Sequence, residues 1–292
     1  MTNLSDPMTP SLLQERSEFY LTLAQSFLTP QTQAHYRAMV DYLADDLADL
    51  DRSLTYRLET QVDALRATLS KLASPEELLV EYSRMFLQPP RMATLNVCHP
   101  LDGAMMGGTV AEIENYYRWY GVERGEHFKD LADHVSVQLE FVSWLYAQAA
   151  QGMPDGTPDA EAAARHFLHQ FVLRWAPHLE QGIEEAGRKL DVKANPYLPL
   201  ARILSIAARC DAAANPDWVK PRRRAAAAIE KARRNSADRG ITPDAMAEME
   251  RILSSKGLST DHLHLALHAR REAPGLSTTA AECELNIPVG QA

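Results

Sequence analysis

Apolar residues that recur every three or four positions are the feature that most constrains the fold of this chain. Leu12, Phe19, Leu23 and Phe27 follow this spacing and stop near Pro30, a pattern typical of an amphipathic helix. No stretch shows the sustained alternation of apolar and polar residues that a half-buried strand requires. Ala and Leu also far outnumber Val and Ile among the 292 residues. We therefore expect an all-α fold, a single helical bundle.

The same periodicity predicts where the helices lie. We expect helices over residues 10–28, 31–45, 53–72, 111–120, 132–150, 160–186 and 197–211, with a break near Pro177. Another helix should begin at Pro75, with Ser74 as its cap and Glu77 closing a capping box. Residues 88–108 are rich in Pro and Gly and form the longest irregular region, which is typical of a functional loop.

The composition changes after Asn215-Pro216, which suggests two parts: a helical domain over residues 10–214 and a C-terminal extension over 215–292 that is partly helical and partly disordered. Residues 220–239 carry eight Lys/Arg and two acids, a net charge of +6. Because the whole chain has a formal charge of -9, the remainder carries -15. An acidic body disfavours bulk nucleic acid and favours a basic peptide or protein as partner.

The remaining sequence signals narrow the class of protein. Three widely spaced cysteines without a CxxC, and an N-terminus without a secretory or twin-arginine signal, favour a cytoplasmic protein. No apolar run approaches the roughly 20 residues of a membrane-spanning helix, so stable membrane insertion is not expected. The pairs His166/His169 and His264/His268 lack further ligands at zinc spacing, and no phosphate-binding loop occurs. We therefore expect neither a metal nor another cofactor.

Acidic residues beside a histidine mark the expected helix over residues 132–150. Asp133 and Glu140 fall on one helical stripe, and His134 lies on the neighbouring one. One interpretation is that Asp133 caps the helix and His134 is structural. A second is a helical enzyme in which His134 is a general base oriented by Asp133 or Glu140, although the sequence offers it no nucleophile. A third is an adaptor for nucleic acid or lipid acting through residues 220–239.

Three sequence blocks follow one another within about 100 residues. The first is Glu81-Tyr82-Ser83-Arg84-Met85-Phe86, and the second is Asp133-His134 followed by Leu139-Glu140-Phe141. The third is FLHQFVLRWAP, with Phe167, His169, Trp175 and Pro177. Together they resemble the TorD/DmsD/NarJ family of redox-enzyme maturation chaperones, whose signatures are acidic-Tyr-x-x-Leu-Phe, Asp-His-x4-Leu-Glu-Phe and a later Phe-x-x-x-Phe-x-x-x-Trp-x-Pro helix. The resemblance covers about residues 10–212. It departs from the family after Pro100, where Leu101-Asp102-Gly103 replaces the usual aromatic and acidic or small residues.

The resemblance implies an all-helical, non-enzymatic chaperone that binds a molybdopterin oxidoreductase catalytic subunit, through its twin-arginine signal peptide or as the apo form, while the cofactor is inserted and before export. The expected client-binding residues are Tyr82, Met85, Phe86, Pro100, Asp102, Asp133, His134, Glu140 and Phe141. The carboxylates would meet the paired arginines, and the aromatic and methionine side chains would line a groove for the apolar stretch. Either a monomer or a domain-swapped homodimer is compatible with long connecting loops.

Overall fold

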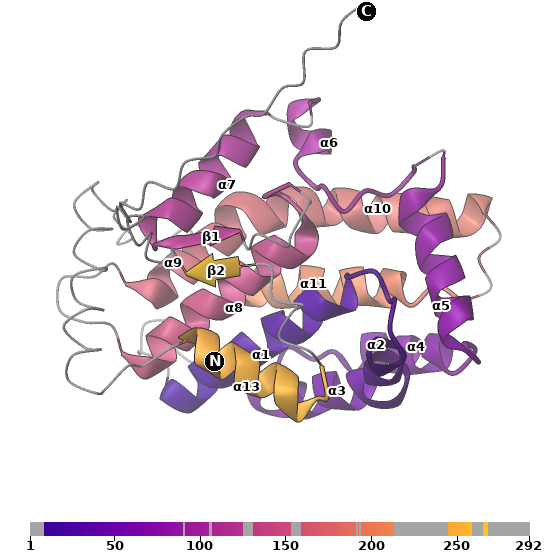
Figure 1. Ribbon diagram of the computed structural model, residues 1–292, viewed down its shortest axis with the longest axis horizontal. Helices are drawn as coiled ribbons and strands as arrows, with labels where there is room; N and C mark the ends of the chain where they lie inside the picture. Colours follow the sequence, from indigo (N-terminus) through magenta and orange to yellow (C-terminus); the bar gives the residue numbers. More distant parts are fainter. Residues whose placement is uncertain are drawn as a thin grey trace, which may run out of the picture.

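Helix α8 (Val135–Gln151) runs through the centre of the fold, which is a computed structural model (Figure 1). The structure describes residues 9–89, 91–104, 107–124, 131–152, 159–190, 192, 194–212, 245–258 and 265–267. All thirteen residues from Val135 to Ala147 are buried, so α8 is covered on every side. The apolar sequence of α8 explains this buried position, because a helix that is hydrophobic on all sides lies within a core.

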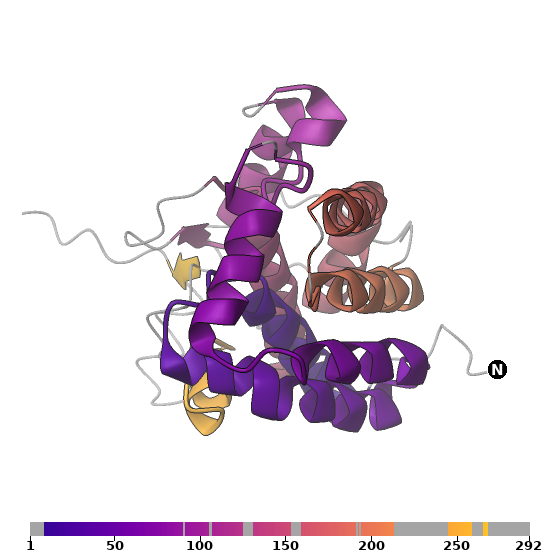
Figure 2. The same ribbon diagram turned by 90° about the vertical axis from the view of Figure 1, so that its right-hand side faces the viewer.

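The remaining helices and strands follow one another along the chain. They are α1 (Pro10–Ser26), α2 (Gln33–Arg37), α3 (Leu43–Leu54), α4 (Glu59–Leu69), α5 (Pro75–Tyr82), α6 (His99–Asp102), α7 (Gly108–Trp119), β1 (Val122–Arg124), α9 (Ala160–Phe167), α10 (Leu173–Lys189), α11 (Tyr197–Asp211), α13 (Ala245–Ser255) and β2 (Leu265–Leu267). The end-on view shows α10 and α11 side by side, with α3 and α4 as a second pair (Figure 2). The predicted all-α class is confirmed; the two strands have three residues each and pair antiparallel.

Local capping explains where several helices begin. Thr9 caps α1 by accepting a hydrogen bond from the Leu12 backbone N–H at 3.4 Å. Ser74 accepts from the Glu77 N–H at 3.3 Å, and Pro75 takes the first helical position of α5. The Glu77 carboxylate in turn accepts the Ala73 N–H at 2.8 Å. The predicted helix start at Ser74-Pro75 is therefore confirmed.

The boundary expected between residues 45 and 53 was wrong. Helix α3 continues to Leu54, and the turn to α4 occupies residues 55–58 instead. The buried Asp51 carboxylate accepts the backbone N–H groups of Arg57 at 3.1 Å and Leu58 at 2.8 Å, which holds the turn closed. Thr55 and Arg57 have positive φ angles of 58° and 64°, conformations that apolar periodicity does not reveal.

Among the described residues, three π-helical turns interrupt the helices, at Ala38–Tyr42, Ser83–Leu87 and Leu168–Val172. The break expected at Pro177 was wrong, because α10 runs through this proline without interruption. The irregular turn lies a few residues earlier, at Leu168–Val172. Two of the three blocks that carry the family resemblance therefore contain a π-helical turn, a feature that is frequent at functional sites.

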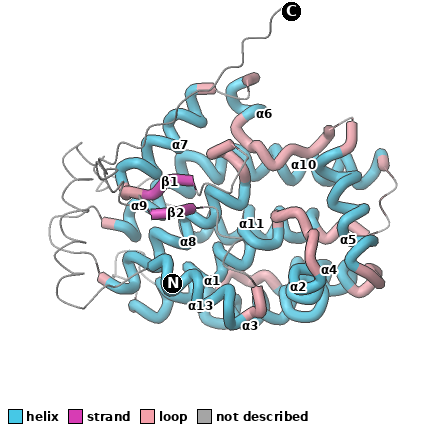
Figure 3. The backbone as a smooth tube through the Cα atoms, in the orientation of Figure 1, coloured by secondary structure: helices cyan, strands magenta, loops and turns pink. Residues whose placement is uncertain are grey.

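The loop between α5 and α6 lies against α10 (Figure 3). Gly182 permits this approach, since a Cβ at that position would stand 2.6 Å from the Met92 carbonyl oxygen. From the C-terminal part of the chain, α13 packs against α8 and α1. The proposed division into residues 10–214 and 215–292 stays a prediction, and the basic segment 220–239 lies outside the described residues. None of the described helices is long and apolar enough to cross a membrane.

Candidate functional site

The Asp133 side chain fastens the α5–α6 loop to the start of α8. It is fully buried, and its carboxylate accepts hydrogen bonds from the Cys98 backbone N–H at 3.1 Å and from Asn96 Nδ2 at 3.3 Å. The Val135 N–H donates to the Leu95 carbonyl at 2.9 Å. A buried carboxylate that accepts N–H groups in this way holds two chain segments together.

His134 is the N-cap of α8, and its Nδ1 accepts a hydrogen bond from the Ser136 N–H at 3.2 Å. The interpretation in which Asp133 caps this helix is therefore wrong. His134 accepts a backbone N–H of the first turn of α8, whereas Asp133 accepts a backbone N–H of the loop. His134 is only 6% exposed.

Gln138 joins the second and third sequence blocks. Its Nε2 donates to the Asp133 carbonyl at 2.8 Å, and its Oε1 accepts the Trp175 indole N–H at 2.9 Å. Both side chains are buried, so each polar group needs a partner within the protein. The contact fixes α10 against the start of α8.

The first sequence block packs as core. Tyr82, Met85 and Phe86 are each at most 4% exposed. Tyr82 and Phe86 meet edge to face with ring centroids 5.1 Å apart, and both contact the ring of Tyr197 from α11. In this arrangement they support α5 and its π-helical turn and do not form an open groove.

Glu140 and Phe141 point to different neighbours of α8. Glu140 is fully buried, and its Oε1 lies 3.5 Å from Gln25 Nε2 on α1. Phe141 packs in an aromatic cluster with Tyr117 at 4.8 Å and Phe167 at 5.1 Å between centroids. The structure therefore does not bring Glu140, Phe141 and the Tyr82 group together on one surface.

Of the predicted site residues, Pro100 is exposed and Asp102 is half-buried, both in α6. The Asp102 carboxylate accepts the Thr109 backbone N–H at 3.0 Å and its hydroxyl at 2.7 Å. This links α6 to the start of α7. A Cβ at Gly107 would overlap the Asp102 side chain, so the close approach requires glycine.

Cys98 lies beneath this loop. Its side chain is fully covered, and burial raises the pKa of the thiol to about 12, with the negative charges of Asp133 and Asp102 adding to the effect. A thiol with this pKa is almost entirely protonated near neutral pH and is a poor nucleophile. The environment is therefore structural, and it makes Cys98 a sensitive reporter of loop opening.

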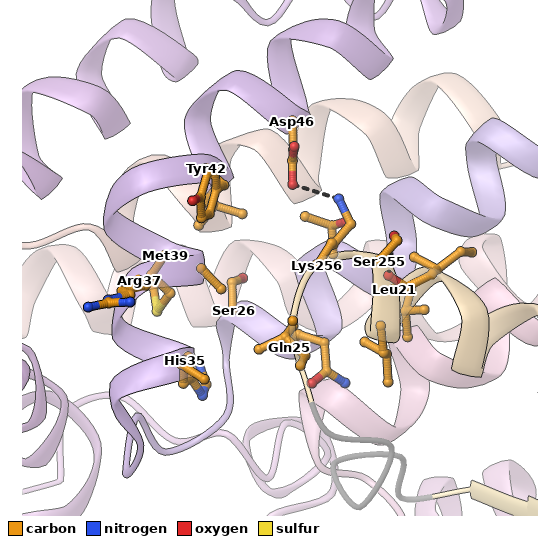
Figure 4. Close-up of a pocket in the computed structure, with 18 residues that line it drawn as sticks. Leu21, Gln25, Ser26, His35, Arg37, Met39, Tyr42, Asp46, Ser255 and Lys256 are labelled. Atoms are coloured by element: carbon orange, nitrogen blue, oxygen red, sulfur yellow. Dashed lines mark hydrogen bonds and ion pairs between the residues drawn. The ribbon is translucent and has the colours of Figure 1, made fainter.

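A pocket of about 460 Å³ opens on another face, between α1, the segment from α2 to α3, and the end of α13 (Figure 4). His35, Arg37 and Met39 lie on one wall and Lys256 on the other, with Gln25 and Ser26 of α1 between them. Leu21, Leu43, Ile252, Leu253 and Leu258 also line it. Gln25 connects this pocket to the buried Glu140. Sequence reasoning missed the pocket, because its walls are far apart along the chain.

Sequence reasoning also missed a buried charge cluster. Asp211, at the end of α11, forms an ion pair with Arg16 at 3.0 Å and accepts hydrogen bonds from the hydroxyls of Tyr20 at 3.0 Å and Tyr56 at 2.5 Å. Burial raises the pKa of Asp211, and the Arg16 charge opposes that shift. The Arg16 guanidinium also lies 5.8 Å from the ring centre of Tyr146. The cluster unites α1, α8, α11 and the turn before α4.

Within the described ranges, no group of three or more His, Cys, Asp or Glu side chains could hold a metal ion. His166 Nδ1 instead lies 2.7 Å from the Tyr116 hydroxyl. The fold and these contacts define an all-α protein. Its three sequence blocks mainly hold the helices and the α5–α6 loop in place around α8.

Comparison with known proteins finds similarity over part of the chain. Residues 51–181 match the family model described as the nitrate reductase delta subunit. The selenate reductase assembly chaperone of Thauera selenatis is 27% identical over 124 residues, which are 41% of this chain and 64% of the relative. The chlorate reductase assembly chaperone of Ideonella dechloratans is 29% identical over 128 residues, 41% and 66% respectively. The chain thus covers just under two thirds of the length of these two relatives.

A longer match reaches the chaperone protein TorD of Photobacterium profundum, with 23% identity over 178 residues, which are 58% of this chain and 81% of the relative. No solved structure matches the chain. Over these segments the chain is similar to the TorD/NarJ family of maturation chaperones.

Proposed function

We propose that the chain is a non-enzymatic chaperone for the catalytic subunit of a molybdopterin oxidoreductase. It binds the subunit's twin-arginine signal peptide, or the apo subunit, in the cytoplasm while the cofactor is inserted and before export. The observation that carries the proposal is the similarity to two proteins named as assembly chaperones of selenate and chlorate reductase.

Charge complementarity supports a basic peptide as the ligand. The chain outside residues 220–239 carries -15, which attracts a cationic partner during encounter. An arginine can bind a carboxylate through two parallel hydrogen bonds, so each arginine of the pair needs an accessible carboxylate.

Burial divides the predicted binding residues into two roles. Pro100 and Asp102 on α6 are accessible and, in this proposal, contact the client directly, whereas His134 is buried at the start of α8. Asp133 positions this surface through the loop. Tyr82, Met85, Phe86, Glu140 and Phe141 would reach a client only if their helices moved, so we propose that they support the site from within.

The separate environments of the acidic residues argue against the enzyme alternative. Asp133 is bound by Cys98 and Asn96 of the loop, whereas Glu140 faces Gln25 on α1. A relay would need Asp133 or Glu140 to orient the His134 ring, but its Nδ1 accepts the Ser136 N–H.

Calorimetric titration with a twin-arginine signal peptide tests the proposal. We expect the peptide to bind, and the same peptide with both arginines replaced by glutamine to bind at least about tenfold more weakly, because charge-assisted hydrogen bonds are lost. Equal affinity for the two peptides, or no binding to a panel of such peptides, would contradict the proposal.

The proposed contact surface has its own test. Asp102→Asn should lower the affinity for the arginine peptide by about tenfold, since the amide keeps the shape and one of the two hydrogen bonds from Thr109 but loses the charge. Asp45→Asn is the matched control, because Asp45 of α3 lies in an exposed ion pair with Arg66, and it should leave the affinity unchanged. If both variants bind as the parent does, Asp102 is not a contact residue.

A further inference from the structure

The C-terminal helix α13 lies on the helical domain as an amphipathic ligand would. Its apolar side chains Met249, Ile252 and Leu253 are 0%, 6% and 1% exposed, whereas Glu250 and Ser254 face away and are exposed. The buried positions follow the i, i+3, i+4 spacing of a helix that binds in a groove. The groove is formed by α1 and α8, with α3 at the end of the helix.

Charged residues fix the position of α13 in this groove. Lys256, just beyond the helix, forms ion pairs with Glu18 of α1 at 3.2 Å and with Asp46 of α3 at 2.6 Å. At the other end, Glu248 accepts a hydrogen bond from Gln14 Nε2 at 2.5 Å. The groove thus offers an apolar floor with two carboxylates at one end, which suits an apolar helix that carries a cation.

The groove is larger than the helix that occupies it. The pocket of about 460 Å³ continues from Ile252, Leu253 and Lys256 toward Met39 and Tyr42 (Figure 4). The Tyr42 side chain, at the outer wall, is 57% exposed. A longer or differently shaped apolar segment could therefore use space that α13 leaves open.

Residues 213–244 separate α13 from α11 in the sequence, and the matched family segment ends at residue 181. Three buried apolar side chains, the two ion pairs of Lys256 and the Gln14–Glu248 hydrogen bond hold α13 in place, and the entropy cost of ordering a helix of eleven residues opposes them. A competing helix that makes contacts of the same kind can displace such a segment.

We propose that the groove of α1, α3 and α8 is a docking surface for the apolar, cation-bearing part of the client's signal peptide, and that α13 occupies it as an internal ligand until the client displaces it. This inference rests on the proposed function. The apolar stretch of such a peptide suits the floor of the groove, and a cation that flanks this stretch suits Glu18 and Asp46 as Lys256 does, while the paired arginines are left for the Asp102 surface.

The test uses the full chain and a fluorescent peptide with the sequence of residues 242–258. Ile252→Glu prevents α13 from docking by placing a carboxylate in the apolar floor. If α13 is docked nine tenths of the time in the parent, this variant should bind the labelled peptide about tenfold more tightly, measured by fluorescence anisotropy. Ser254→Glu adds the same charge on the exposed face and should bind as the parent does.

Lys256→Glu gives a second release variant that leaves the apolar core of the contact intact, and circular dichroism checks that each variant is folded. An unlabelled twin-arginine peptide should compete with the labelled peptide and should bind both release variants more tightly than the parent. Folded release variants that bind the labelled peptide no better than the parent would overturn the inference. A rise in dimer on size-exclusion chromatography of the parent, removed by Ile252→Glu, would also overturn it and assign the groove to α13 of a second copy.

The two proposals fail in different ways. A twin-arginine peptide that binds the parent and the release variants equally would overturn the docking surface and leave the proposed function standing. If no variant binds that peptide, the proposed function is contradicted; tight binding of the labelled peptide to the release variants would then still support α13 as a displaceable ligand.

Discussion

At the scale of single residues, Asp133 is a structural link whose partners lie 35 and 37 positions earlier in the sequence, at Cys98 and Asn96. The carboxylate is the acceptor for a loop that would otherwise leave a buried N–H group unpaired. Any effect of Asp133 on client binding would therefore act through the position of the loop.

Replacing Asp133 by alanine should open this loop. The Cys98 N–H loses its acceptor, and removal of the nearby negative charge lowers the pKa of the thiol from about 12 toward its ordinary value. In a Cys210→Ser, Cys283→Ser background, we expect the labelling rate of Cys98 by an aromatic disulfide reagent at pH 8 to rise at least about tenfold.

Asp159→Ala is the matched control for this measurement. Asp159 also accepts a backbone N–H, from Ala162 at 3.0 Å, but it does so at the start of α9. The change should cost about 1 kcal/mol of stability and leave the labelling of Cys98 near the parent rate. Similar labelling of both aspartate variants would show that Asp133 does not hold the loop.

At the scale of elements, the α5–α6 loop depends on contact with α10 as well as with α8. The loop backbone at Met92 packs closely against Gly182 of α10. The π-helical turn at Leu168–Val172 precedes α10, and Gln138 holds Trp175 of the same helix. The loop, α8 and α10 thus form one connected unit.

Gly182→Ala should disturb that unit although alanine favours helices. Its Cβ would meet the Met92 carbonyl oxygen at 2.6 Å, so the loop backbone must shift, at a cost of about 1 to 3 kcal/mol in the free energy of unfolding. Thermal unfolding measures this cost, and limited proteolysis between α5 and α6 should become faster.

Gly187→Ala in the same helix is the comparison. There the Cβ meets the end of the Asn195 side chain at 2.9 Å, a group that can move aside. We expect it to be neutral or to stabilise by up to about 1 kcal/mol through helix propensity. Equal melting temperatures for the two variants would argue against a tight contact at Met92.

At the scale of the whole molecule, the cluster around Asp211 joins four parts of the chain. Asp211→Ala would leave the Arg16 guanidinium and the hydroxyls of Tyr20 and Tyr56 without their partner in the core. Removing one member of a buried ion pair typically costs about 3 to 5 kcal/mol. Urea denaturation of the full chain should show a loss of this size.

An exposed aspartate, Asp63, provides the control for this prediction. Asp63 pairs with Arg66 at 2.9 Å, but both side chains are about half exposed or more. Asp63→Ala should therefore change the free energy of unfolding by about 1 kcal/mol or less. A loss in Asp211→Ala no larger than this would mean that the cluster does not carry global stability.

Helix positions and helix caps were predictable from the sequence, because they depend on residues that are close together along the chain. The helix over residues 10–28 and the helix at 197–211 are confirmed as α1 and α11, with an error of two residues at the end of α1. The start at Ser74-Pro75 is confirmed because capping involves residues only three or four apart. The three sequence blocks carried the family resemblance, which the comparisons confirm.

The sequence alone therefore determined the all-α class and several helix starts, because helical periodicity and capping are local interactions. Only the tertiary structure decided that Asp133 binds Cys98, that Glu140 faces Gln25, and that α13 lies on α1 and α8. These contacts join segments far apart in the chain. The physical reason is that the apolar stripe of a helix predicts which side chains are buried, whereas their contact partners depend on how the whole helices pack.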